Sequence, residues 1–176
     1  MSGSPALDLV GTVESRRSAP EDLLETPAHL ERWVHACEEL PDHVVADAAG
    51  LDSAVRLREA VHGLALDRLR GRPFAPAGLD VVNRAARGPV PTLELGEGGL
   101  HLTGDLRSAL VHVARGALTL LADREACLKE CGGRDCTRLY LDRSRGARRT
   151  WCGMEACGNR VKAAAYRARR QPREES

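Results

Sequence analysis

Four cysteines near the C-terminal end form two brackets of the same spacing. Four residues separate Cys131 from Cys136, and four separate Cys152 from Cys157. Paired thiolates at short, repeated spacing allow a segment with little core of its own to build a tetrahedral zinc site. Four sulfur ligands close the coordination sphere, so the predicted Zn²⁺ is structural and leaves no open position for water.

Two further cysteines have to be weighed against this site. Cys127 lies four residues before Cys131, so it could replace Cys131 as a ligand or pair with it on oxidation. The symmetry of the two brackets favours Cys131, and an idle thiol is the simpler interpretation of Cys127. Cys37 stands alone on an apolar helical stripe, where a buried small hydrophobe is the expected role.

The composition suits a small globular protein without membrane segments. The chain has 176 residues, of which 43% are hydrophobic and only 3% aromatic, so its core must consist mostly of Leu, Val and Ala. No apolar run is long enough to span a bilayer, and the first residues lack the pattern of a signal peptide. We therefore expect a cytoplasmic protein, a compartment in which clustered cysteines indicate a metal site before disulfides.

Charge divides the chain into an acidic body and a basic end. Residues 1–123 carry 12 Lys and Arg against 18 Asp and Glu, whereas residues 124–176 carry 14 against seven. The net charges are thus −6 and +7, and they sum to the +1 of the whole chain. We place a domain boundary at residues 123–127, because the sign of the charge changes there, and such a basic end is often found where a protein meets nucleic acid.

The pattern of the first 123 residues predicts helices and one hairpin. Residues 7–13 read either as a short strand or as the start of a helix. Thr26 and Pro27 open a helix, and the leucines that alternate around Gly96–Gly99 predict a hairpin. Further helices are predicted over residues 51–70, 76–87 and 105–122, the last capped by Asp105 or Thr103.

The second part reads as a small module built around the cysteines. Arg138–Asp142 is predicted as a strand, Arg143–Arg149 as a basic loop, and Trp151 as a cover over the metal site. Gly158 suits a tight turn in which backbone N–H groups point at thiolates, and a basic helix is expected over 160–170. The whole chain is thus predicted to be α+β: a mainly helical domain with a hairpin (1–123), the four-cysteine module (127–170) and a disordered tail (171–176).

The basic residues of the module suggest contact with phosphates. Residues 134–173 hold 12 basic and three acidic side chains. A rigid module with such a surface fits the backbone of nucleic acid, although an Arg-rich face that is merely solvated would look the same. The predicted contacts are Arg145, Arg148, Arg149, Arg160, Lys162 and Arg167.

Residues 152–162 carry a specific resemblance. Cys152-Gly-Met-Glu-Ala-Cys157-Gly158-Asn159-Arg160 resembles the CGNR zinc finger of bacteria, and Leu141–Arg145 and Arg149–Cys152 resemble the same family. The rest of the chain, with Leu7-Asp8-Leu9-Val10-Gly11-Thr12-Val13 near its start, more loosely resembles the ABATE domain that precedes this finger. The resemblance implies zinc bound by Cys131, Cys136, Cys152 and Cys157, and a stress-related transcription regulator that binds nucleic acid.

Two positions depart from the family pattern. Gly11 stands where the family has Asn beside the Thr, which would alter any ligand pocket that this Asn lines. Thr150 stands where a second basic residue often precedes the Trp.

These observations favour a zinc-dependent DNA-binding regulator, with DNA preferred over RNA. Its acidic N-terminal domain would sense a small-molecule effector or form a homodimer. The alternative is a ligand-binding or protein-interaction protein in which the finger is only a structural staple. We expect no enzyme, because the sequence has no His-Glu-x-x-His, no Gly-x-Ser-x-Gly and no P-loop.

Overall fold

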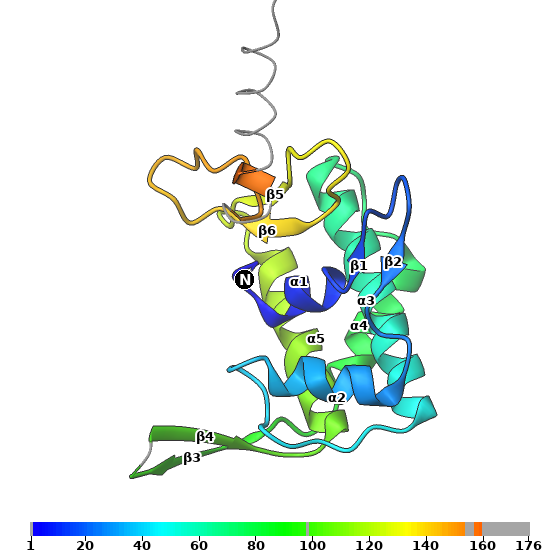
Figure 1. The fold of residues 1–176 in the computed structure, drawn as a ribbon, viewed down its shortest axis with the longest axis vertical. Helices are drawn as coiled ribbons and strands as arrows, with labels where there is room; N and C mark the ends of the chain where they lie inside the picture. The colour runs from blue at the N-terminus through cyan, green and yellow to red at the C-terminus, as the bar shows by residue number, and fades with distance from the viewer. Residues whose placement is uncertain (1, 98, 154–156, 160–176) are drawn as a thin grey trace, which may run out of the picture.

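The computed structural model describes residues 2–97, 99–153 and 157–159, and it shows helices flanked by three small antiparallel strand pairs (Figure 1). The helices are α1 (Pro5–Val10), α2 (Pro27–His35), α3 (Ala48–Leu69), α4 (Pro76–Ala85) and α5 (Leu106–Ala122). The strands are β1 (Val13–Glu14), β2 (Glu21–Asp22), β3 (Thr92–Gly96), β4 (Gly99–Thr103), β5 (Leu128–Glu130) and β6 (Leu139–Leu141). The α+β class predicted from the sequence is confirmed.

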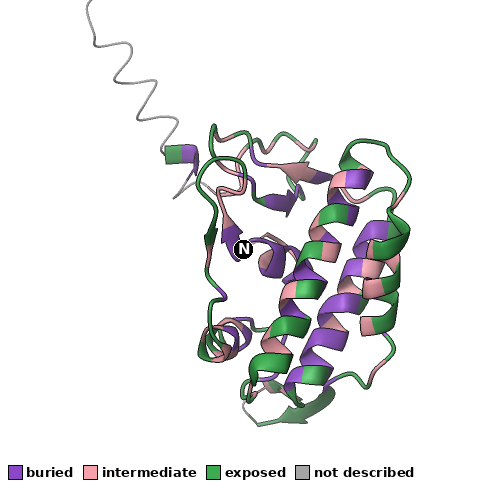
Figure 2. Ribbon diagram, turned by 90° about the vertical axis from the view of Figure 1, so that its right-hand side faces the viewer, coloured by how far each residue is buried: buried purple, intermediate pink, exposed green. Residues whose placement is uncertain are grey.

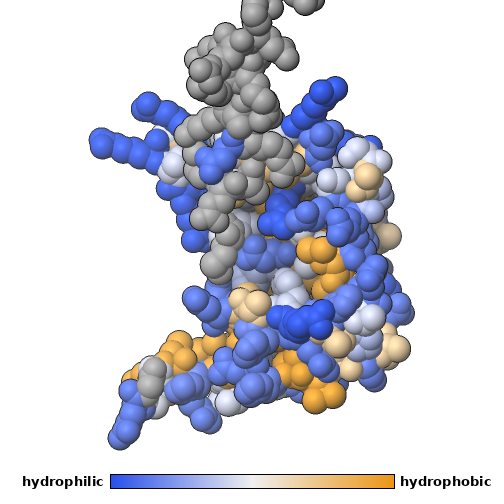
Figure 3. Space-filling view, viewed as in Figure 1, coloured by the Kyte–Doolittle hydropathy of each residue, from blue (hydrophilic) through white to orange (hydrophobic). Residues whose placement is uncertain are grey.

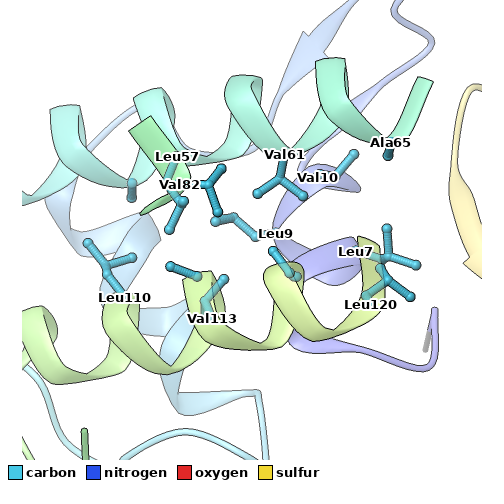
Figure 4. Close-up of a cluster of buried hydrophobic side chains, with 14 of the residues drawn as sticks. Leu7, Leu9, Val10, Leu57, Val61, Ala65, Val82, Leu110, Val113 and Leu120 are labelled. Atoms are coloured by element: carbon cyan, nitrogen blue, oxygen red, sulfur yellow. The ribbon is translucent and has the colours of Figure 1, made fainter. Parts of the chain in front are cut away.

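The core lies between α1, α3, α4 and α5. The short helix α1 contacts both α3 and α5, and Leu7 and Leu9 are almost fully buried between them (Figure 4). The inward faces of α3 and α5 are buried and their outward faces exposed (Figure 2), as expected for amphipathic helices. The strand alternative for residues 7–13 was wrong for all but Val13: Pro5 opens a helical turn, and the helix ends at Gly11.

Polar caps set the starts of the longer helices. The side chains of Thr26, Asp47 and Asp105 accept hydrogen bonds from the backbone N–H groups of His29, Gly50 and Ser108. Each bond satisfies one of the free N–H groups in a first helical turn. Helix α3 therefore begins at Ala48, three residues earlier than predicted, because its cap is Asp47.

The hairpin formed by β3 and β4 projects from the helical body (Figure 1). Its register pairs Leu93 with Leu102 and Leu95 with Leu100, which places four leucines on one face. Leu93, Leu95 and Leu100 are 61%, 85% and 62% exposed, and Figure 3 shows hydrophobic surface along this hairpin. The hairpin predicted from the alternating leucines is present, with its apolar face open to solvent.

The four-cysteine module packs directly on the helical body. Leu128 of β5 and Leu139 and Leu141 of β6 belong to the same buried cluster as the leucines of α1 and α5. The backbone N–H of Leu141 also donates to the carbonyl of Ser2 at 2.9 Å. The sign of the charge changes at residues 123–127, but the hydrophobic core continues from the helical body into the module.

Among the described helices, none combines the length and the apolar character that crossing a bilayer requires.

Candidate metal centre

The first knuckle is the turn that joins β5 to β6. It begins at Cys131, whose backbone N–H donates to the carbonyl of Arg138 at 2.9 Å, and it closes with the N–H of Cys136 donating to Gly133 at 3.1 Å. A Cβ added at Gly133 would lie 3.1 Å from the Cβ of Cys136 and 3.4 Å from the sulfur of Cys157. Glycine at this position therefore leaves the space that the sulfur atoms need.

The second knuckle lies against the first. The N–H of Gly132 donates to the carbonyl of Thr150 at 3.0 Å, and the N–H of Cys152 points at the sulfur of Cys131 at 3.3 Å. Trp151 is half-buried and packs on the cluster of Cys131, Tyr140 and Cys157, as predicted. A turn is present at Gly158, whose N–H donates to the carbonyl of Gly153 at 3.0 Å, while residues 154–156 within it lie outside the described residues.

The four predicted ligands converge on one point. The sulfur atoms of Cys131, Cys136, Cys152 and Cys157 all lie within 4.8 Å of one another. The sulfur of Cys152 is 3.8 Å from that of Cys136 and 3.7 Å from that of Cys157. Zinc–sulfur bonds of about 2.3 Å in a tetrahedron require sulfur atoms roughly 3.8 Å apart. The donor set and its spacing thus fit a closed, structural Zn²⁺ site.

Without a cation, the surroundings of the thiols shift their pKa values in opposite directions. Burial opposes ionisation of Cys131, but hydrogen bonds from the N–H groups of Cys152 and Gly133 outweigh it and lower the pKa of this thiol. Burial, together with the neighbouring thiols, raises the pKa of Cys136 to about 11 and raises that of Cys152 further. Four thiolates so close together need a divalent cation, so metal binding would release protons.

Cys127 is not part of this group of ligands. It precedes β5, and its carbonyl accepts a hydrogen bond from the N–H of Asp142 at 2.8 Å. Its side chain lines a cavity between the N-terminal residues, α5 and β6. The position of its sulfur outside the converging group agrees with the preference for Cys131 over Cys127 as the ligand. Cys37 is buried in the main core, and burial raises its pKa, as expected for a structural thiol.

Arg149 holds the second knuckle in place. Its guanidinium donates to the carbonyls of Trp151, at 2.8 Å, and Cys152, and it lies 4.5 Å above the ring of Tyr140. Tyr140 is fully buried, and its hydroxyl donates to the carbonyl of Arg149 at 2.8 Å. The sequence predicted Arg149 as a phosphate contact, but in the structure its guanidinium donates to carbonyls within the module. A charge count cannot separate such a brace from a free arginine.

An ion pair between the buried Asp142 and the half-buried Lys129 organises the basic loop that follows β6. The side chain of Asp142 accepts from Lys129 Nζ at 2.7 Å and from the N–H groups of Ser144 and Arg149, both at 2.9 Å. Burial alone would raise the pKa of Asp142, but the hydrogen bonds from Lys129 and Ser144 hold it well below its usual range. Lys129 Nζ also donates to the carbonyl of Ala147, which has a φ of 48° in the left-handed region.

Lys129 and Asp142 were not singled out as site residues from the sequence. The signal available was the run Leu141–Arg145, in which a single acidic residue stands among arginines directly after a strand. The hydrogen bonds of Lys129 and Asp142 hold the backbone of the basic loop in one conformation.

The predicted phosphate contacts are only partly described. Arg145 and Arg148 are exposed on the ordered loop, and neither forms an ion pair with a carboxylate among the described residues. Arg160, Lys162 and Arg167, and the basic helix predicted over 160–170, lie outside the described residues. Arg143 is also exposed and donates to the carbonyl of Gly3 at 3.1 Å, so it marks where the loop passes over the N-terminal residues.

The turn between β1 and β2 joins the module to the helical body. The N–H of Arg16 donates to Thr137 Oγ1 at 3.2 Å, and Arg138 pairs with Glu14 at 2.6 Å. Gly11 ends α1 just before β1, where an added Cβ would lie 3.3 Å from the carbonyl oxygen of Asp8 and 3.9 Å from Arg138 Nε. A longer side chain at this position would therefore face the metal module.

Comparison with known protein families agrees with this architecture. The model of the ABATE family, described as "Putative stress-induced transcription regulator", matches residues 3–124. The model of the CGNR zinc finger matches residues 128–170, which include the four converging cysteines. A search among curated proteins found no match to the chain. Because the first match covers more than half of the sequence, the chain belongs to the ABATE family and carries a C-terminal CGNR zinc finger.

Proposed function

We propose that this protein is a DNA-binding transcription regulator of the cytoplasm, not an enzyme, in which zinc holds the DNA-contacting surface in shape. The observation that carries the proposal is the loop at residues 143–149. Its backbone is fixed from within by Asp142 and Lys129, while Arg145 and Arg148 stay exposed. A rigid loop that presents free guanidinium groups suits bidentate contacts with phosphates, which carry most of the affinity for a duplex.

The surrounding charge supports the same proposal. The chain as a whole carries only +1, but residues 124–176 carry +7. The acidic body would be repelled by a polyanion, so the module would meet the duplex first. Its family description points in the same direction.

The test is a titration of the full chain with a fluorescent duplex at several salt concentrations. For each phosphate contacted, the slope of log K against log salt is about −0.9. The single variants Arg145→Gln and Arg148→Gln should each weaken binding on every duplex and make the slope shallower by roughly one. Arg32→Gln, which removes an exposed charge from α2, is the matched control and should change neither quantity.

Two outcomes would reject the proposal. One is the absence of binding to any duplex at low salt by the zinc-loaded chain. The other is an equal loss of affinity in Arg145→Gln, in Arg148→Gln and in Arg32→Gln, since each removes one charge and an equal loss would reflect only net charge.

The second candidate function is a ligand-binding or protein-interaction protein in which the zinc finger is a staple. It is favoured by the packing of Leu128, Leu139 and Leu141 into the main core, because a module used only for stability needs that contact and no partner. Deleting residues 124–176 would not separate the candidates cleanly, since it would also open the core. The surface variants above do so, because they leave the packing intact.

The N-terminal domain would then supply the control of binding, by an effector or by formation of a homodimer. The leucine face of the β3–β4 hairpin is the exposed apolar surface that a second copy could cover. An effector would need a cavity.

A further inference from the structure

A cavity of about 620 Å³ lies at the end of the helical body that is distant from the cysteines. It is bounded by the first turns of α3 and α5 and by the end of α4. Small-molecule sites usually measure about 300–1,000 Å³, so its size is that of a ligand site. None of the metal ligands or basic-loop residues lines it.

The floor of the cavity is apolar. Leu57, Leu106, Leu110 and Val111 line it and are at most 8% exposed. Gly88 closes one side, where an added Cβ would lie 2.5 Å from Val111 Cγ2. The floor is therefore well packed and offers an aliphatic surface.

The rim is cationic. Arg84, Arg87 and Arg107 line the cavity, are exposed, and form no ion pair with any carboxylate in the part of the chain that the structure describes. Asp47 and Asp105 at the rim cap α3 and α5 and keep their negative charges. Hydrogen bonds from Ser108, and then the nearby charge of Arg107, lower the pKa of Asp105. Three guanidinium groups against two carboxylates leave this opening with a net charge of +1, in a region, residues 1–123, whose net charge is −6.

These features define the chemistry of a ligand. None of the described residues that line the cavity is aromatic, so they offer no stacking surface for a nucleobase. An aliphatic floor below guanidinium groups matches a molecule with an alkyl chain and one carboxylate. We infer that the cavity binds an aliphatic monocarboxylate, with its chain on the leucine floor and its head group at the arginines. This inference names the effector of the proposed regulator, and its regulatory role rests on that proposed function. The binding of the carboxylate to the cavity does not depend on it.

Two helices connect the cavity to the zinc module, so a ligand bound in the cavity could alter the module. Helices α3 and α5 both begin at the cavity, and both run toward β5 and β6. At the far end of α3, Arg68 donates to the carbonyl of Ala126 at 2.6 Å and to that of Leu120. A change in the spacing of α3 and α5 would therefore reach the segment that leads into β5.

The test is a calorimetric titration of the zinc-loaded full chain with decanoate, kept below its micelle concentration. Saturable binding of one decanoate per chain is expected, with weaker binding of octanoate and of the uncharged 1-decanol. Arg84→Gln, Arg87→Gln and Arg107→Gln should each weaken decanoate binding about two- to fivefold, the range of partly exposed ion pairs. Arg32→Gln removes the same charge from α2 and should leave the affinity unchanged.

A variant that fills the cavity provides a second reading. Ser53 lines the cavity and is exposed on α3, so Ser53→Phe should abolish decanoate binding while the thermal midpoint stays close to that of the wild type. The inference is overturned if decanoate does not saturate, if 1-decanol binds as well as decanoate, or if Arg32→Gln loses as much affinity as Arg107→Gln. It is also overturned if light scattering shows a dimer that Ser53→Phe converts to a monomer, because a second copy would then fill the cavity.

The two proposals fail separately. Decanoate binding without any binding to a duplex would leave the cavity assigned and reject the DNA-binding regulator. Duplex binding by a chain that does not bind decanoate would reject the assignment of the cavity and leave the DNA-binding proposal intact.

Discussion

The sulfur of Cys136 lies 3.8 Å from the sulfur of Cys152, although the two residues belong to different knuckles. This is the edge of a tetrahedron around zinc, so a metal ion would be the main link between the knuckles. The strands β5 and β6, by contrast, are anchored by leucines in the main core. The module therefore has a part that depends on metal and a part that depends on packing.

Removal of zinc should loosen the knuckles first. In hydrogen exchange measured by mass spectrometry, we expect chelation to remove the protection of the amides of Gly132 and Cys152. The amide of Leu141, which donates to Ser2, should stay protected. Elemental analysis should find one zinc per chain before treatment. Knuckle amides that stay protected in a chain shown to be free of metal would contradict the assignment.

Cys127 and Cys131 form a matched pair for testing the ligand set. Cys131→Ala should abolish stoichiometric zinc binding, because it removes one of the four converging sulfur atoms. Cys127→Ala should retain one zinc per chain, because its sulfur lies outside that group. Both are measured by elemental analysis after dialysis against a weak chelator. Loss of zinc from the Cys127 variant would mean that the ligands exchange.

Arg148 and Arg149 are neighbours in sequence with different predicted roles. Arg149→Gln loses hydrogen bonds to two carbonyls and the contact with Tyr140, so we expect it to lower the free energy of unfolding by about 1–3 kcal/mol. Arg148→Gln should leave stability within about 0.5 kcal/mol and weaken only duplex binding. Chemical denaturation of the zinc-loaded variants distinguishes the two. Equal stability of both would remove Arg149 from its role as a brace.

Local chemistry explains why the metal ligands and most helices could be predicted from sequence. The cysteine spacing defines a site within one short segment, and caps such as Thr26 and Asp105 act on their own helices. Residues 7–13 form a short apolar run, whose period does not distinguish a strand from a buried helix. Packing on both α3 and α5 buries every residue of α1 except Asp8, which no window of sequence reveals.

The features that escaped prediction depend on residues distant in sequence. Leu128, Leu139 and Leu141 reach the main core only because the N-terminal residues pass beside β6. The cavity is assembled from the ends of three helices, and its arginines look like any others in a chain with 24 of them. Likewise, the role of Arg149 follows from the carbonyls that it meets and not from its charge.

His62 should make the stability of the fold fall measurably in mild acid. Burial on α3, together with the charges of Arg16 and Arg70, lowers its pKa from 6.5 to about 4, although Glu59 opposes the shift. Above pH 6.5 the imidazole is neutral in both the folded and the unfolded chain, so its ionisation does not change the free energy of unfolding. As the pH falls from 6.5 toward 4, the unfolded chain takes up the proton first, so stability falls by up to about 2 kcal/mol, allowing for partial solvent access.

The variant His62→Gln isolates this effect. Denaturation curves at intervals between pH 7 and pH 4.5 should show a shallower loss of stability for His62→Gln than for the wild type. His101→Gln, an exposed position on β4, serves as the control and should follow the wild type. Since the cysteine site also takes up protons in acid, the comparison is made at constant zinc and above pH 4.5, with zinc content measured at each point. Parallel curves for all three proteins at equal zinc content would show that His62 titrates normally in the folded chain.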